Sequence, residues 1–188
     1  MNFETDIVNC LETLKNGGII LYPTDTIWGI GCDATNVNAV EKIYRLKNRS
    51  DEKAMIVLVA DERQVLQHVA SPDLAVFDWL KKNDKPTTVI YDGAIGVAEN
   101  LVPDLGTIAI RVCHDGFCKQ LIKRFRKPIV STSANISGQP SPKNFSEIRE
   151  EIKSGVDYVV QWRQDDLSIG QPSSIIRWNK DGSATILR

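Results

Sequence analysis

The α/β character of this chain is clearest in one stretch, residues 107–135, which reads TIAIRVCHDGFCKQLIKRFRKPIVSTSAN. Residues 107–112 are apolar and β-branched and predict a strand. Residues 116–125 predict a helix, and residues 129–130 predict a second strand. This strand ends in a polar segment that begins at Ser131. A strand, a helix and a strand in succession are typical of an α/β domain.

The alternation continues in both directions from this stretch. Short apolar runs predict strands, and apolar side chains three and four residues apart predict helices. Helices are expected at residues 7–14, 39–47, 62–69, 71–80, 116–125 and 145–152, and strands at 19–22, 55–59, 87–91, 107–112, 129–130, 158–161, 174–178 and 184–187. The last three strands have little helix between them, so the pattern predicts an α/β fold with a twisted, mixed sheet.

The starts of two helices are marked by capping residues. Asn36 or Asn38 is placed to cap the helix at 39–47. Ser71 is expected to cap a later helix, with Pro72 at its first position. The earlier helix runs out near Lys47, whose side chain is expected to be exposed.

Length and composition are those of an ordinary globular protein. The chain has 188 residues, of which 42% are hydrophobic and 25% charged, and this is enough to bury one core. We therefore expect a single domain over residues 1–188. Residues 1–6 lack a basic and apolar leader, and no run approaches the roughly 18 apolar residues of a membrane span, which favours the cytosol.

Charge and cysteine content restrict the partners. A net charge of −1 argues against a surface devoted to nucleic acid, which needs clustered Lys and Arg. The basic run at residues 119–127 is also explained by cations that complement a helix dipole. The four cysteines lack the spacing of a zinc site and the density of a disulfide scaffold, so reduced thiols are expected at Cys10, Cys32, Cys113 and Cys118.

Common catalytic motifs are absent from the sequence. It contains no HExxH, GxSxG, GxxxxGK[ST] or GxGxxG pattern, which argues against the standard hydrolase and P-loop classes. His68 and His114 are the only histidines and suggest no ligand cluster. We therefore expect chemistry without a histidine base.

Three polar segments remain, each after a predicted strand or helix, where loop backbone can meet a ligand. Residues 23–29, PTDTIWG, form a hydroxyl-lined wall or a turn that bonds its own backbone. Residues 47–49, Lys-Asn-Arg, combine a compact charge for a triphosphate with a fork for a carboxylate, although cations at a helix end are favourable without a ligand. Residues 131–137, STSANIS, form an anion-binding nest or a helix cap.

These segments share their order and spacing with one enzyme family. YPTDT at residues 22–26, Lys47-x-Arg49 and STSANISG at residues 131–138 resemble the threonylcarbamoyl-AMP synthases, the YrdC-like proteins, in the short form without an extra C-terminal domain. The resemblance covers nearly the whole chain. It continues in TIAIR at 107–111, GQPSSII at 170–176 and ILR at 186–188.

The resemblance implies a twisted open sheet with a concave binding face. It also implies a nucleotidyltransferase that joins L-threonine, bicarbonate and ATP into threonylcarbamoyl-AMP with release of pyrophosphate, for threonylcarbamoyladenosine formation in tRNA. Mg²⁺ is expected to arrive with ATP rather than at a protein site. Downstream tRNA-modification proteins and tRNA itself are the further partners that the resemblance suggests.

Residue roles follow from the same resemblance. Lys47 and Arg49 are expected to be catalytic. Threonine is expected to bind at Thr24, Arg49, Arg111, Ser131 and Ser173, and the nucleotide at Lys47, Thr107, Ser133, Asn135, Ser141 and Arg188.

The sequence departs from the family pattern at several loop positions. Ser50 stands where the family usually has proline, and Cys113 takes a proline place after Arg111. Ala54 and Lys85 replace further residues of common loop motifs. A non-catalytic RNA-binding protein or an inactive paralogue of the same fold is the alternative function.

Overall fold

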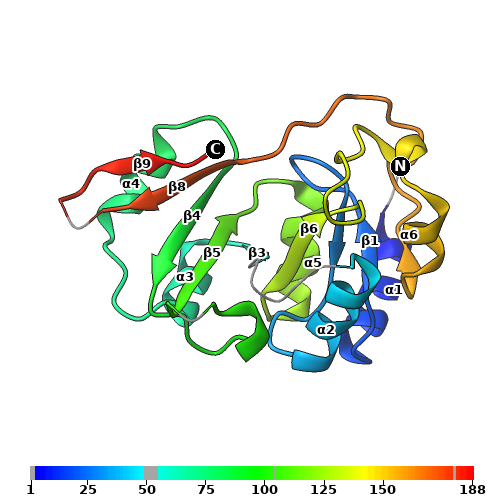
Figure 1. Ribbon diagram of the computed structural model, residues 1–188, viewed down its shortest axis with the longest axis horizontal. Coiled ribbons are helices and arrows are strands. Elements are labelled where there is room, and N and C mark those ends of the chain that lie inside the picture. Colours follow the sequence, from blue (N-terminus) through cyan, green and yellow to red (C-terminus); the bar gives the residue numbers. More distant parts are fainter. Residues whose placement is uncertain (1–2, 49–54, 104, 180) are drawn as a thin grey trace.

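The computed structural model describes residues 3–48, 55–103, 105–179 and 181–188 (Figure 1). Within these residues, nine strands form one mixed sheet in the order β7-β1-β2-β6-β3-β5-β4-β8-β9. The strands are β1 (Ile20–Tyr22), β2 (Gly29–Gly31), β3 (Ile56–Val59), β4 (Thr87–Asp92), β5 (Thr107–Val112), β6 (Ile129–Ser133), β7 (Tyr158–Val159), β8 (Ser174–Trp178) and β9 (Ala184–Ile186).

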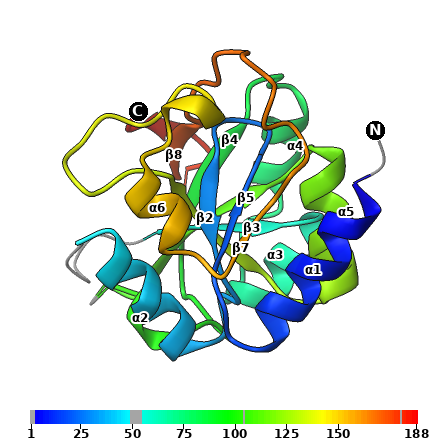
Figure 2. The same cartoon turned by 90° about the vertical axis from the view of Figure 1, so that its right-hand side faces the viewer.

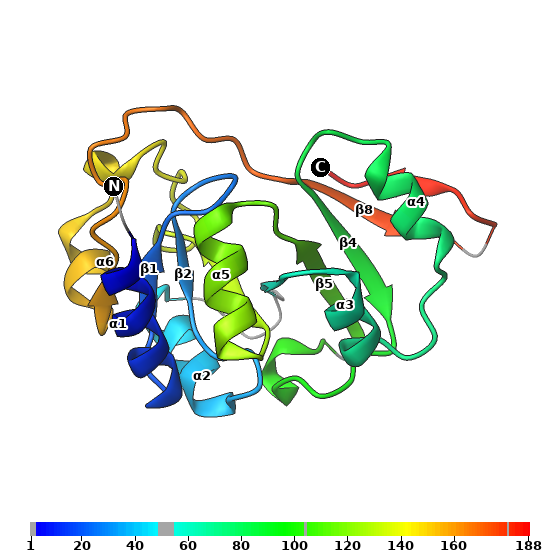
Figure 3. The ribbon, with the colours of Figure 1, turned by 180° about the vertical axis from the view of Figure 1, so that it is seen from behind.

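Helices cover both faces of the sheet. The described α-helices are α1 (Glu4–Lys15), α2 (Val37–Leu46), α3 (Glu62–His68), α4 (Ala75–Lys81), α5 (Gly116–Phe125) and α6 (Glu150–Ser154), with 3₁₀ turns at Glu99–Leu101 and Phe145–Glu147. Figure 2 shows α1, α3 and α5 on one side of the sheet and α2 and α6 on the other. Seen from behind, α5 lies between α1 and α3 (Figure 3). None of the described helices has the length and apolar content that a membrane crossing requires.

The sheet mixes parallel and antiparallel pairs, as the late strands predicted. Strand β6 pairs antiparallel with β2 on one side and with β3 on the other, so it joins the two halves of the sheet. Strand β3 runs parallel to β5, and β4 runs parallel to β8. The predicted fold class is therefore confirmed, whereas the assignment of the whole chain to one domain stays a prediction.

A long connection crosses the sheet from one end to the other. Residues 160–173, which we call the crossing segment, link β7 at one edge to β8 near the other (Figure 1). Asp6 in α1 anchors the first part, because its carboxylate accepts the backbone N–H groups of Gln161 at 2.9 Å and Trp162 at 3.0 Å. At Gly170 the segment touches the turn after β1, where an added Cβ would meet the Thr26 carbonyl oxygen at 2.0 Å.

Three expectations about local structure are wrong. Strand β2 was not predicted, because Gly29 falls in the segment 23–29 that was interpreted as a turn or a hydroxyl-lined wall. Helix α4 begins at Ala75 and not at Pro72, and Ser71 has a φ of 51° and does not cap it. The helix predicted at 145–152 is a 3₁₀ turn followed by the short α6.

One capping prediction is confirmed. The Asn36 side chain accepts the Ala39 N–H at 3.1 Å at the start of α2. This contact satisfies a backbone donor that has no partner within the helix.

Candidate functional site

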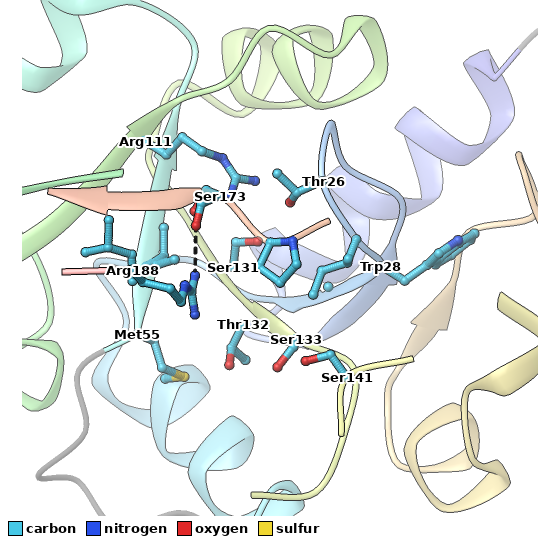
Figure 4. A pocket seen from close by; sticks show the side chains of 15 residues that line it. Thr26, Trp28, Met55, Arg111, Ser131, Thr132, Ser133, Ser141, Ser173 and Arg188 are labelled. Atoms are coloured by element: carbon cyan, nitrogen blue, oxygen red, sulfur yellow. Dashed lines mark hydrogen bonds between the residues drawn. The ribbon is translucent and has the colours of Figure 1, made fainter. Parts of the chain in front are cut away.

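A cavity of about 220 Å³ lies over one face of the sheet, where the resemblance implied a concave binding face (Figure 4). Five strands contribute to its walls, together with the turn after β1, the loop after β6 and the end of the crossing segment. Its polar lining consists of Thr26, Arg111, Ser131, Thr132, Ser133, Ser141, Ser173 and Arg188, and the rest of Ile27, Trp28, Gly29, Met55, Ile56, Pro172 and Ile175. No carboxylate is among these residues, so the cavity presents hydroxyls and arginines to a ligand.

Six of the predicted site residues meet in this cavity although they are far apart in the chain. They are Arg111, Ser131, Ser133, Ser141, Ser173 and Arg188. Residues that bind one ligand must lie around one cavity, and a ligand that fills this cavity would contact several segments of the chain at once.

Strand β6 supplies two of the hydroxyls. Ser131 and Ser133 are two residues apart, so their side chains emerge on the same face of the sheet. Gly29 lies opposite Ser133 on β2, and a Cβ there would be only 3.1 Å from the Ser131 hydroxyl oxygen. The glycine therefore leaves room for the Ser131 hydroxyl, and this close approach explains why β2 tolerates a residue that weakens strands.

Arg111 is the buried cation of the cavity. Its side chain is 3% exposed, and Nη2 donates to Asp25 Oδ1 at 3.0 Å. Its Nε is buried and has no hydrogen-bond partner among the described residues. An arginine that is paired with one carboxylate and still has an unbonded N–H donor can bind a second anion.

Ser173 and Arg188 close the cavity from the other side. The Ser173 hydroxyl is 2.8 Å from the Thr88 hydroxyl. The backbone carbonyl of Ser173 accepts a hydrogen bond from Arg188 Nη2 at 3.2 Å (Figure 4). The chain around Ser173 is therefore tied to β4 and to Arg188, which keeps the crossing segment in place at the rim.

The expectation of an exposed Lys47 is wrong. Lys47 is 1% exposed and is absent from the residues that line the cavity. Its Nζ donates to the carbonyl oxygens of Ser133 and, at 2.5 Å, Asn135, and its own carbonyl accepts the Ser137 N–H at 2.9 Å. Lys47 therefore clamps the turn after β6, because a buried ammonium needs acceptors around it. Its predicted partner Arg49 lies outside the described residues, as do Ser50 and Ala54.

Thr24 does not line this cavity. Its hydroxyl donates to the Ile27 carbonyl at 2.8 Å and accepts the Thr26 N–H at 3.0 Å, so this threonine bonds its own turn. Thr26, two residues later, lines the cavity instead. Nothing in the pattern of residues 23–29 distinguishes these two hydroxyls.

Asn135 and Thr107 also lie outside this lining. Asn135 lines a neighbouring cavity of about 110 Å³, which shares Ser141 with the main one. Thr107 begins β5, about 13 Å along the strand from Arg111 at the usual rise per residue. The structure therefore places Asn135 next to the cavity and Thr107 away from it.

Sequence reasoning missed the apolar part of the lining. Trp28 packs on Phe145 with ring centroids 4.8 Å apart, and Met55, Ile56 and Ile175 complete that surface. Nothing in their pattern separates them from core residues, because apolar side chains line most ligand pockets and most cores alike.

Cysteines and metal-binding groups add nothing to this site. All four cysteines are free and buried, and burial raises the pKa of the Cys10 and Cys32 thiols well above the ordinary value. Within the described part of the chain, no three or more His, Cys, Asp or Glu side chains are grouped to hold a metal ion.

Comparison with known proteins places the chain among several similar ones. A family model described as "Telomere recombination", which covers Sua5, YciO and YrdC proteins, matches residues 12–188. A threonylcarbamoyl-AMP synthase of Pseudoalteromonas translucida (strain TAC 125) is 32% identical over 93% of this chain and 94% of its own length. One from Idiomarina loihiensis is 36% identical over 76% of this chain and 78% of its own length.

A solved structure shares the fold. The crystal structure of P. abyssi Sua5 in complex with L-threonine matches with a TM-score of 0.86 and 23% identity over 98% of this chain. This chain spans 54% of that protein.

Proposed function

Because this chain belongs to the Sua5/YciO/YrdC family, we propose that it is a threonylcarbamoyl-AMP synthase, which converts L-threonine, bicarbonate and ATP into threonylcarbamoyl-AMP and pyrophosphate. One observation carries the proposal. A relative named for this activity is 32% identical and aligns over 94% of its own length. The resemblance expected from the sequence segments is thereby confirmed.

The chemistry suits a cavity without a histidine. The threonine amine attacks carbon dioxide derived from bicarbonate to give a carbamate, whose oxygen then attacks the α-phosphorus of ATP while pyrophosphate leaves. Such a transfer gains mainly from alignment of the reactants and from cations near the phosphoryl oxygens. A hydroxyl-lined cavity with Arg111 and Arg188 supports both.

Residue roles are part of the proposal. Threonine would bind at Arg111, Ser131 and Ser173, with Thr24 acting through its turn and Arg49 as a further anion ligand. The nucleotide would meet Ser133, Asn135, Ser141 and Arg188, with Lys47 acting through the turn that it clamps and Thr107 as a more distant candidate. Arg111 is the strongest of these assignments, because it is both buried and short of acceptors.

Mg²⁺ would enter with ATP in this proposal. Among the residues that the structure describes, the cavity lining contains hydroxyls but no side-chain carboxylate, and Mg²⁺ in such sites is held largely by phosphate oxygens and water. When bound, the ion neutralises phosphate charge, while the protein hydroxyls orient the triphosphate. We also propose a cytosolic location and transfer of the product to tRNA-modification proteins.

The proposal is tested by pyrophosphate release from ATP, measured with threonine and with bicarbonate omitted in turn. Release should require both. Arg111→Gln should lower kcat/KM for threonine by roughly a hundredfold, since a charge-assisted pair in a desolvated site is lost. Arg177→Gln is the matched control, because Arg177 is an exposed arginine of β8 that pairs with Asp92 at 2.9 Å outside the cavity.

The contrary results are distinct. The absence of any pyrophosphate release would favour the inactive paralogue or the RNA-binding alternative. Release that continues without threonine and without bicarbonate would refute the synthase. Equal losses in the two arginine variants would mean that Arg111 does not contact threonine.

A further inference from the structure

Asp25 and Arg111 form an ion pair behind the wall of the cavity. Arg111 Nη2 donates to Asp25 Oδ1 at 3.0 Å, and the two side chains are 3% and 12% exposed. The second carboxylate oxygen, Oδ2, accepts the backbone N–H of His114 at 3.4 Å. Both oxygens of Asp25 are therefore bound to groups at the end of β5.

This pair joins parts of the sheet that are not neighbours. Asp25 belongs to the turn between β1 and β2, and Arg111 to β5, with β2, β6 and β3 between β1 and β5. The pair therefore holds the turn after β1 against the end of a distant strand. Thr26, the residue after Asp25, lines the cavity.

Arg111 keeps a buried donor that no described residue accepts. Its Nε is buried without an acceptor among the residues described, and buried donors of this kind are rare in folded proteins. Figure 4 shows the Arg111 side chain at the cavity edge, with its guanidinium group directed toward Thr26. An anionic group in the cavity, such as a carboxylate, would supply the missing acceptor.

We propose that Asp25 is a positioning residue for threonine binding, which holds the Arg111 guanidinium so that its remaining donors face the threonine carboxylate. This inference rests on the proposed function. Asp25 does not line the main cavity; it borders a neighbouring cavity of about 230 Å³. It therefore acts on threonine only through Arg111.

Positioning and charge balance lead to opposite expectations. If Asp25 only neutralised Arg111, its removal would leave a stronger positive charge for the substrate carboxylate and tighten threonine binding. If Asp25 orients the guanidinium group, removal of Asp25 lets the Arg111 side chain move. Threonine binding then weakens, because the planar guanidinium fork binds a carboxylate only when its donors face that carboxylate.

Asp25→Asn and Asp25→Glu separate these two roles. The asparagine keeps the size and one acceptor oxygen, and the glutamate keeps the charge but moves it by one methylene. Both should raise KM for threonine about tenfold, a factor that corresponds to about 1.4 kcal/mol, and leave kcat and KM for ATP within twofold. Asp92→Asn is the matched control, because it breaks an exposed aspartate–arginine pair outside the cavity.

A double variant gives a second measurement. In an Arg111→Gln background, Asp25→Asn should add less than twofold to KM for threonine, since its effect passes through Arg111. Threonine titration calorimetry checks the same affinities without turnover, and thermal melting checks that each variant is folded.

Each outcome decides one point. An unchanged or lower KM in Asp25→Asn, a normal KM in Asp25→Glu, or independent effects in the double variant would overturn the positioning role. If Asp25→Asn fails to fold, KM for threonine in Asp25→Glu decides it. If Asp25→Glu fails to fold, Asp25→Asn and the double variant decide it. A wild-type protein without threonine-dependent pyrophosphate release would instead refute the proposed function.

Discussion

Replacing Lys47 by methionine should destabilise the protein, although lysines at helix ends are usually dispensable. Lys47 is 1% exposed, and its Nζ donates to the carbonyl oxygens of Ser133 and Asn135. Methionine fills similar space without the ammonium group. The substitution therefore removes the clamp on the turn after β6 and leaves the packing of the side-chain stem largely intact.

The magnitude follows from two opposing terms. Hydrogen bonds to a charged group contribute roughly 1.5–3 kcal/mol each, so the loss of two costs about 3–6 kcal/mol. Part of this is recovered, because burying the ammonium group had its own desolvation cost. A net loss of about 3 kcal/mol in the free energy of unfolding should lower Tm by about 6–12 °C for a chain of this length.

Thermal and urea unfolding followed by circular dichroism measure this loss. Lys42→Met is the matched control, because Lys42 lies on the same helix α2, is exposed, and donates to a single carbonyl, Gly17 O, at 2.8 Å. The control should change the free energy of unfolding by less than about 0.5 kcal/mol. Equal melting of the two variants would refute the clamp and mean that Lys47 is a mobile cation in solution.

Three further perturbations test contacts of the crossing segment. Asp6→Ala removes acceptors for the Tyr158 hydroxyl at 2.7 Å and for two backbone N–H groups, and should cost about 3 kcal/mol in urea unfolding. Gly170→Ala should lower Tm and raise KM for threonine, since its Cβ would clash with the Thr26 carbonyl, whereas Gly116→Ala meets no atom within 4 Å and should do neither. Burial, and then Asp6, raise the pKa of Tyr158 to about 12 from 10.0, so the native state holds this proton more tightly. The contribution of this raised pKa to the free energy of unfolding is complete below pH 10 and is lost as the pH rises toward 12. In Tyr158→Phe the free energy of unfolding should therefore fall less steeply between pH 10 and 12 than in the wild type. An unchanged pH dependence would contradict this.

The regular elements were predictable because local periodicity determines them. The helix at α5 and the strands at β4 and β5 have the residue types and spacing that their structures need. Strand β2 was not predictable, because Gly31 is required by packing: a Cβ there would lie 2.6 Å from both the Tyr22 ring and the Val130 carbonyl oxygen. A prediction from local sequence alone assigns such a glycine to a turn.

The membership of the site was only partly predictable. Ser131, Ser173 and Arg111 were identified by resemblance, and the structure brings them to one cavity. The burial of Lys47 was missed, because exposure depends on which distant backbone covers a side chain. The ion pair of Arg111 with Asp25 was missed for the same reason: the two residues are 86 positions apart.

The walls of the cavity come from segments between Thr26 and Arg188, so they are contributed by almost the whole chain. Contacts between segments so far apart form late and slowly during folding, since the closure of long loops must precede them. A partly folded chain would have its central strands before it had Ser173 and Arg188 in place. The ability to bind substrate should therefore appear only at the last step of folding, and its recovery after dilution from urea would report that step directly.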